Sequence, residues 1–77
     1  TWAVIGRMAR RLPVAQQSLL GRVVDHDGQA RITLTDGMTA TISHGELRGG
    51  MLGAWCEETG GYLEFPLGEI ASVAGVP

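Results

Sequence analysis

The chain has 77 residues and a formal net charge of −2 at pH 7, and all six of its basic residues are arginines. A chain of this length accommodates one domain with a single core. Proteins that bind nucleic acid mainly by neutralising phosphates carry a clear basic excess, so this charge balance disfavours nucleic acid as the partner.

A single cysteine, Cys56, excludes an internal disulfide and favours a reducing compartment. No apolar run approaches the roughly 18–20 residues that a membrane-spanning helix needs. The start of the chain also lacks a signal-peptide pattern. We therefore expect a cytoplasmic protein without a membrane span.

Residues 1–12 have a helical rather than a strand period. Their apolar side chains recur every three or four positions, at Trp2, Ile5, Met8 or Ala9, and Leu12. Pro13 ends this segment, because the residue before a proline is disfavoured in the helical conformation. We predict an N-terminal helix or arm over residues 1–17. It either covers one end of the following domain or stays extended and orders on binding.

Residues 18–77 are predicted to form one β-barrel domain that begins with a strand over residues 19–24. Gly21 lies in the middle of this segment, where a glycine often marks a bend or bulge. Asp27 and Gly28 follow, and an Asp-Gly pair tolerates the positive φ of a tight hairpin turn. The sequence thus predicts the first β-hairpin at this point.

The next two strands, over residues 30–34 and 38–43, show the clearest pattern. Apolar and polar residues alternate in both, with the apolar set at Ala30, Ile32, Leu34, Met38, Ala40 and Ile42. A side-chain period of two places one set in the core and the other in solvent. Asp36 and Gly37 supply a second tight turn between the two strands.

The remainder predicts a loop over residues 44–50 and strands over residues 51–57, 62–65 and 69–73. In the first of these strands Leu52, Ala54 and Cys56 share one face. The whole pattern predicts an all-β fold, a small five- or six-stranded antiparallel barrel with a short N-terminal helix or arm. The expected core residues are Ile32, Leu34, Ile42, Leu63 and Phe65.

Catalysis is not expected from these residues. Ser43 and His44 are neighbours on one strand, so their side chains point to opposite faces and cannot act as nucleophile and base. Asp25, His26 and Asp27 suggest a metal site, but no cysteine or second histidine stands at ligand spacing, and turns select aspartate for other reasons. We predict no catalytic residue, no metal site and no cofactor.

Binding is the expected class of function, and two segments support it. Arg7, Arg10 and Arg11 offer guanidinium groups suited to bidentate phosphate contacts, although a solvated helix face has the same composition. Residues 42–50 contain small side chains that let a ligand approach the backbone. The alternative for this second segment is a plain turn between two strands.

These segments resemble the motifs of the PilZ family, whose β-barrels bind the bacterial second messenger cyclic di-GMP. That family carries an RxxxR arm before the barrel, which residues 7–11 (RMARR) match, and residues 60–75 resemble its later strands. The resemblance implies a non-catalytic binding or regulatory module with a cyclic dinucleotide as candidate ligand. The residues implied as ligand-binding are Arg7, Arg11 and Ser43.

The second motif of that family, DxSxxG, is degenerate here. Residues 41–46 (TISHGE) stand in its place, and only Ser43 matches, with Thr41 instead of aspartate and Glu46 instead of glycine. Thr41 lacks the carboxylate that would pair with a guanine or an arginine, and Glu46 adds a negative charge. Both departures are expected to weaken nucleotide binding, so a protein partner is the other candidate.

Two alternatives stay open. The succession of strands and Asp-Gly turns over residues 21–43 also resembles oligonucleotide-binding barrels of the initiation-factor type, which bind RNA in a basic groove with stacking aromatic side chains. The chain has only four aromatic residues and no lysine, so this alternative ranks second. The third is a structural module whose sheet face or open edge strand docks a protein partner in a larger assembly.

Overall fold

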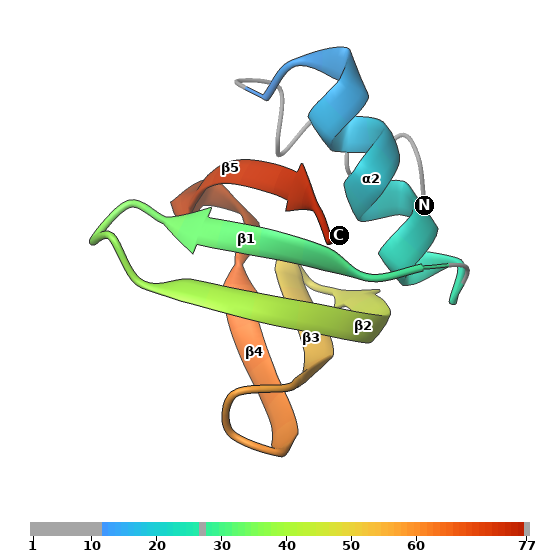
Figure 1. Cartoon of the computed structure of the whole chain (residues 1–77), viewed down its shortest axis with the longest axis vertical. Coiled ribbons are helices and arrows are strands. Elements are labelled where there is room, and N and C mark those ends of the chain that lie inside the picture. Colours follow the sequence, from blue (N-terminus) through green and yellow to red (C-terminus); the bar gives the residue numbers. More distant parts are fainter. Residues whose placement is uncertain (1–11, 27, 77) are drawn as a thin grey trace.

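The computed structural model describes residues 12–26 and 28–76. The predicted helix over residues 1–12, with Arg7, Arg10 and Arg11, therefore lies outside the described residues apart from Leu12. Along the described part of the chain, no helix has the length and apolar character needed to cross a membrane. The elements follow in the order α2 (Val14–Val24), β1 (Ala30–Leu34), β2 (Thr39–Arg48), β3 (Met51–Cys56), β4 (Gly61–Pro66), the 3-10 helix η1 (Leu67–Glu69) and β5 (Ile70–Gly75) (Figure 1).

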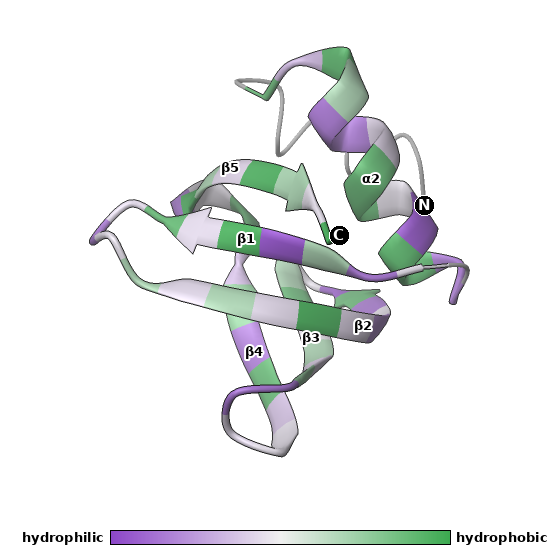
Figure 2. Ribbon diagram, in the orientation of Figure 1, coloured by the Kyte–Doolittle hydropathy of each residue, from purple (hydrophilic) through white to green (hydrophobic). Residues whose placement is uncertain are grey.

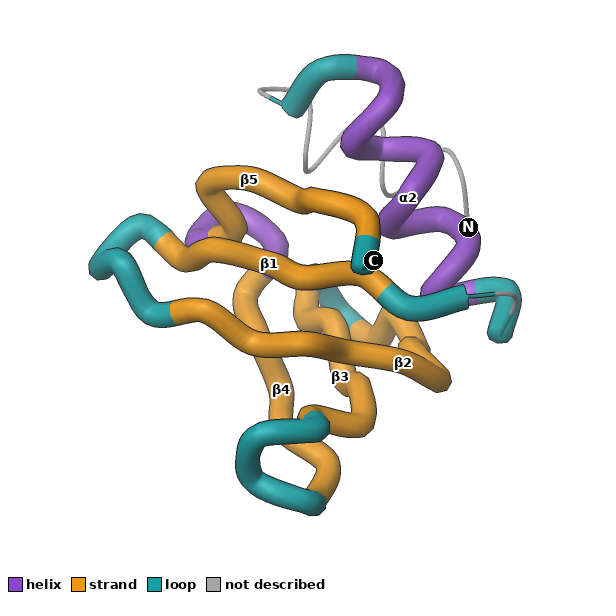
Figure 3. The backbone as a smooth tube through the Cα atoms, viewed as in Figure 1, coloured by secondary structure: helices purple, strands orange, loops and turns teal. Residues whose placement is uncertain are grey.

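The five strands form one antiparallel sheet in the order β4-β3-β2-β1-β5. The chain meanders from β1 to β4 and then returns through η1, so that β5 pairs with the other side of β1. Figures 1 and 3 show β3 and β4 crossing behind β1 and β2, so the sheet curls around its own interior. The predicted all-β fold with a short helix is confirmed. The described sheet is open between its edge strands β4 and β5 and does not close into a barrel.

The prediction of a strand over residues 19–24 is wrong, because these residues form the second half of α2. The helix begins after Pro13, whose carbonyl oxygen accepts hydrogen bonds from the backbone N–H groups of Gln16 and Gln17, both at 3.0 Å. Its buried residues are Leu20, Gly21 and Val23. Because Leu20 and Val23 are three positions apart, they lie on one side of a helix and pack together against the sheet. Gly21 is thus a contact of a helix and not a bend in a strand.

Helix α2 also covers part of the sheet edge formed by β5. The Gln16 side-chain oxygen accepts a hydrogen bond of 2.9 Å from the backbone N–H of Val73 in β5. An edge strand presents backbone groups that have no partner in the sheet, and a covering helix is one way in which proteins protect them. This contact is one reason why the helix is held beside β5 (Figure 1).

The two strands predicted over residues 30–34 and 38–43 are present, and the expected alternation is observed in β1. It does not hold in β2, where Thr41 and Ser43 are buried beside Ala40 and Ile42, and Met38, expected in the core, lies before the strand and is 64% exposed. Ile32 and Ile42 have no exposed surface, and Figure 2 shows hydrophobic and hydrophilic residues following one another along β1.

Phe65 is also buried, and Leu34 packs against the core while partly exposed. Leu63 was expected in the core but is 40% exposed. It pairs with the buried Ala54 of β3, but β4 is an edge strand with a neighbour on one side only, and residues 62–64 are all exposed.

The loop predicted over residues 44–50 is mostly strand, because β2 continues to Arg48. Only Gly49 and Gly50 form the reversal, with φ values of 57° and 79°. Arg48 then pairs with Met51 at the start of β3. A two-residue hairpin with positive φ at both positions favours glycine, so the glycine pair serves this turn.

Candidate functional site

An open pocket of about 460 Å³ lies beside the end of α2 and the outer faces of β2 and β3. Ser43, one of the three residues that the resemblance implies as ligand-binding, lines this pocket. Arg7 and Arg11 lie outside the described residues. The pocket is lined by His26, Gly28, Gln29, Ser43, His44, Trp55, Glu57 and Tyr62.

His26 reaches this pocket because of how α2 ends. The backbone N–H of Asp25 still donates a hydrogen bond of 2.9 Å to the carbonyl oxygen of Gly21. The N–H of His26 donates one of 3.1 Å to the carbonyl oxygen of Val23. His26 then adopts a φ of 59°, in the left-handed region that often ends a helix. Glycine or asparagine is the usual residue at such a position, and histidine adopts this conformation at a cost of about 1 kcal/mol or more.

His44 reaches the same pocket because β2 contains a bulge. Ser43 pairs with Trp55 and Glu46 pairs with Gly53, so His44 and Gly45 together stand opposite one residue of β3. Such an extra residue re-aims the side chains around it. His44 has a φ of 51° and is exposed, whereas the residues before and after it are buried.

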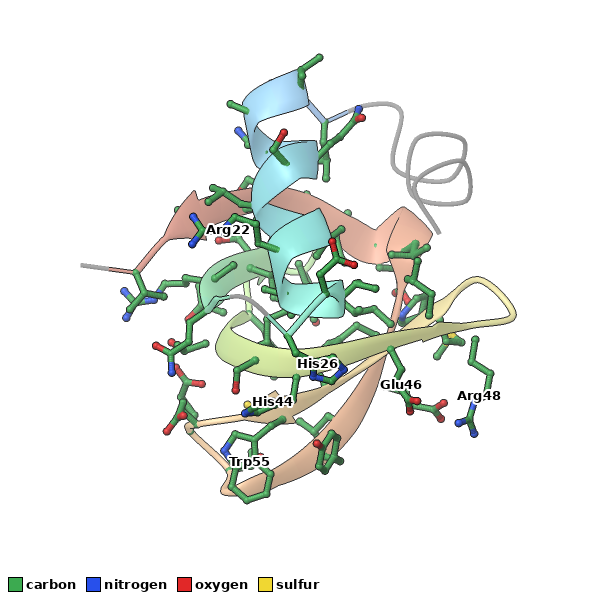
Figure 4. All side chains as sticks on the ribbon, turned by 90° about the vertical axis from the view of Figure 1, so that its right-hand side faces the viewer. Arg22, His26, His44, Glu46, Arg48 and Trp55 are labelled. Atoms are coloured by element: carbon green, nitrogen blue, oxygen red, sulfur yellow. The ribbon has the colours of Figure 1, made fainter. Side chains whose placement is uncertain are left out.

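The helix end and the bulge bring the two imidazole rings into contact. The Nδ1 atoms of His26 and His44 are 3.4 Å apart, with ring centroids 5.6 Å apart and ring planes tilted by 39°. Figure 4 shows the two rings on one side of the molecule, with Trp55 on the same side below them. They are the only two histidines in the chain, and 18 positions separate them in the sequence.

Gly45 allows α2 to lie this close to β2. A Cβ atom at this position would lie 3.0 Å from Cγ1 of Val23 and 3.2 Å from Cδ1 of Leu52. Both distances are shorter than ordinary van der Waals contact. The small residue that was expected to let a ligand approach the backbone instead lets the helix approach it, and so positions His26 beside His44.

Two aromatic side chains form another wall of the pocket. Trp55 and Tyr62 are directly paired across β3 and β4, and their rings meet edge to face, with centroids 5.7 Å apart and planes at 77°. Tyr62 is 64% exposed and Trp55 is partly buried. An edge-to-face pair holds both rings in defined orientations and leaves ring surface available for a planar ligand group.

Ser43 is 7% exposed and borders the pocket, but the other two positions of the degenerate motif do not. Glu46 is exposed and forms an ion pair of 3.5 Å with Arg48. Thr41 is buried on the same strand and contacts Glu58. The negative charge that does line the pocket belongs to Glu57.

The exposed carboxylate of Glu58 links the turn between β3 and β4 to Thr41 of β2. Its two oxygens accept hydrogen bonds from Thr41, one from the backbone N–H at 2.8 Å and one from the hydroxyl at 2.9 Å. The Cys56 thiol donates a weaker contact of 3.4 Å to the same carboxylate. The N–H and hydroxyl of Thr41, together with the backbone N–H of Glu58 itself, lower the pKa of Glu58 from 4.5 to about 2.

We expect Glu58 to make stability depend on pH in the acid range. Its pKa is lower in the folded than in the unfolded chain, so its stabilising effect is complete above pH 4.5 and is lost as pH falls through about 2. Urea unfolding of the protein and of Glu58→Gln should give free energies of unfolding that converge as pH falls across this range. Equal pH dependence in the two proteins would contradict the assigned hydrogen bonds.

Sequence reasoning missed the pairing of His26 with His44, since it looked for ligands close to His26 in the chain. The predicted strand ends at Ser43, but Gly45 is also compatible with a strand that continues through a bulge, and this was the available signal. No group of three or more His, Cys, Asp or Glu side chains converges within residues 12–26 and 28–76. Cys56 is a buried free thiol in β3, as expected of a core residue.

Comparison with known proteins adds no family assignment: no family model, no curated protein and no solved structure matches this chain.

Proposed function

We propose that this protein is a non-catalytic, cytoplasmic binding module whose ligand occupies the pocket between the end of α2, β2 and β3. The observation that carries the proposal is the position of Ser43. It is the motif residue that matches the PilZ pattern, and it borders the same pocket as Trp55 and Tyr62. A hydroxyl beside two aromatic rings suits a ligand with a planar base and polar substituents.

Cyclic di-GMP is the ligand that we propose to test first. A guanine base can stack on Trp55, the Ser43 hydroxyl can hydrogen-bond to it, and Arg7 and Arg11 are the proposed phosphate contacts. Two features are expected to weaken this binding. The Thr41 groups are already used by Glu58, and Glu57 brings a negative charge to the pocket that receives the phosphates.

Isothermal titration calorimetry with cyclic di-GMP tests the proposal. We expect measurable heat for the protein and a loss of affinity of about tenfold or more in an Arg7→Ala, Arg11→Ala double variant and in Trp55→Leu, since stacking and charge-assisted contacts each contribute about 1–3 kcal/mol.

The matched control is Arg48→Ala, which removes one arginine outside this pocket. Its affinity should equal that of the unchanged protein. Absence of heat, or heat that neither variant changes, would contradict the proposed ligand.

An RNA ligand is the second candidate, because Trp55 and Tyr62 expose ring surface of the kind on which single-stranded bases stack. The same variants titrated with a single-stranded RNA oligonucleotide separate the two candidates. Tight RNA binding that falls steeply with salt and is lost in Trp55→Leu would favour RNA over the cyclic dinucleotide.

A further inference from the structure

We propose that His26 and His44 chelate a divalent transition-metal ion of the borderline class, with Zn²⁺ as the best fit, through their two Nδ1 atoms. The inference does not depend on the organic ligand proposed for the pocket. It rests on the distance between two nitrogen atoms, on the backbone conformation of both residues and on the chemistry of imidazole.

The separation of the two nitrogens fits a pair of metal ligands better than a hydrogen bond. At 3.4 Å, the Nδ1 atoms are farther apart than the range of about 2.7–3.2 Å preferred by hydrogen bonds with an N–H donor. Zinc lies about 2.0–2.1 Å from histidine nitrogen, and two such nitrogens at a tetrahedral angle stand about 3.3–3.4 Å apart. In an octahedral site with bonds of this length, adjacent ligands stand only about 2.9 Å apart.

In the tautomer that carries the proton on Nε2 in both rings, the two Nδ1 lone pairs have no proton between them and are both free to bind a cation. A neutral imidazole carries its proton on one nitrogen only and uses the other as an acceptor or a metal ligand. A metal ion between the Nδ1 atoms satisfies both lone pairs at once, and both Nε2 atoms can then keep their protons.

The backbone conformation of both histidines also supports a functional role for this contact. His26 and His44 are the only non-glycine residues with positive φ in the described part of the chain. Strained backbone of this kind persists where surrounding structure enforces it and is concentrated at functional sites. Here both strained residues lie in one contact, one at a helix end and the other at a strand bulge.

The described residues supply two ligands, so water from the open pocket would fill the positions of a tetrahedral ion that they leave open. No third His, Cys, Asp or Glu converges on the pair among the described residues. The site is thus of the open kind, in which a metal keeps exchangeable positions, and not a closed structural site of four protein ligands. Imidazole favours zinc, copper and nickel over the hard ions magnesium and calcium.

Calorimetric titration with Zn²⁺, in the absence of nucleotide and on a chain without a histidine tag, tests the proposal. We expect one ion per chain, no binding of Mg²⁺, and movement of both Nδ1 resonances in ¹⁵N NMR spectra of the imidazoles. His26→Asn and His44→Asn should each bind Zn²⁺ at least about tenfold more weakly. Asparagine is the appropriate replacement because it tolerates positive φ, which preserves the helix end and the bulge.

Two controls separate chelation from general attraction of cations. Glu57→Gln removes a negative charge from the same pocket and should lower Zn²⁺ affinity much less than either histidine variant does. Cys56→Ser should leave Zn²⁺ affinity unchanged, because the thiol is buried in β3. Failure of the protein to bind Zn²⁺, retained binding in both histidine variants, or an equal loss in Glu57→Gln would overturn the proposal. Thermal melts of every variant show whether the fold is kept, and at equal Zn²⁺ concentration the rise in melting temperature should be smaller in both histidine variants than in the unchanged protein.

Discussion

Ile32→Ala should lower the free energy of unfolding by about 2–5 kcal/mol, the largest effect that we expect from one substitution. Ile32 has no exposed surface, and it lies in β1, the strand paired on both sides by β2 and β5. Removing its outer carbons deletes buried apolar contacts and leaves a cavity that the neighbouring strands cannot fill completely. Small domains have total stabilities near the lower end of about 5–15 kcal/mol, so this loss threatens the folded state.

Urea denaturation followed by circular dichroism measures this effect, and two further variants calibrate it. Ile32→Val keeps the β-branch and removes one methyl group, so a smaller loss of about 0.5–1.5 kcal/mol is expected. Arg31→Ala changes the exposed neighbour on the same strand and should alter stability by no more than about 0.5 kcal/mol. A loss under 1 kcal/mol for Ile32→Ala would mean that β1 is not in the core.

Gly45→Val should destabilise the protein by about 1–3 kcal/mol, the usual cost of overpacking a filled interior. Its added carbons enter the space where a Cβ already lies within 3.0–3.2 Å of Val23 and Leu52. The helix must then move away from β2. Because that contact also positions His26 beside His44, the variant should weaken the interaction between the two rings along with the fold.

Gly75→Val is the matched control for this substitution. Gly75 is also a strand residue with no positive φ, and a Cβ atom there meets nothing within 4 Å. Valine suits strand backbone, so this control should be neutral or slightly stabilising. Thermal unfolding of both variants measures the difference, and equal melting temperatures would show that the space beside Gly45 is not limiting.

The two strands around Ile32 and Ile42, and the turn between them, were determined by local sequence. Alternation of apolar and polar residues around Ile32 and Ile42 depends only on the period of the strand, and the Asp36-Gly37 turn depends on positive φ at Gly37 and on the Asp36 side chain accepting the Met38 N–H. These features involve residues within a few positions of one another. The all-β class could therefore be predicted before any tertiary contact was known.

Other elements were decided by packing between distant segments. Residues 19–24 are a short apolar run, which periodicity alone does not assign to helix or strand. The contacts of Leu20 and Val23 with the sheet, and of Gln16 with β5, favour the helix. Leu63 follows a strand pattern correctly yet stays exposed, because burial depends on which neighbours cover the edge strand and not on the pattern itself.

The candidate site likewise combines a residue predicted from local sequence with contacts that depend on packing. Ser43 was predicted as a ligand contact from a short motif, and its neighbours in the pocket come from a helix end, a bulge and two other strands. His26 and His44 are 18 positions apart, and their contact requires the left-handed turn after α2, the bulge in β2 and the space left by Gly45. No local pattern contains all three conditions, because the distance between two side chains depends on how the elements that carry them pack. The sequence alone determined the strands around Ile32 and Ile42, and only the tertiary structure brought the two imidazoles together.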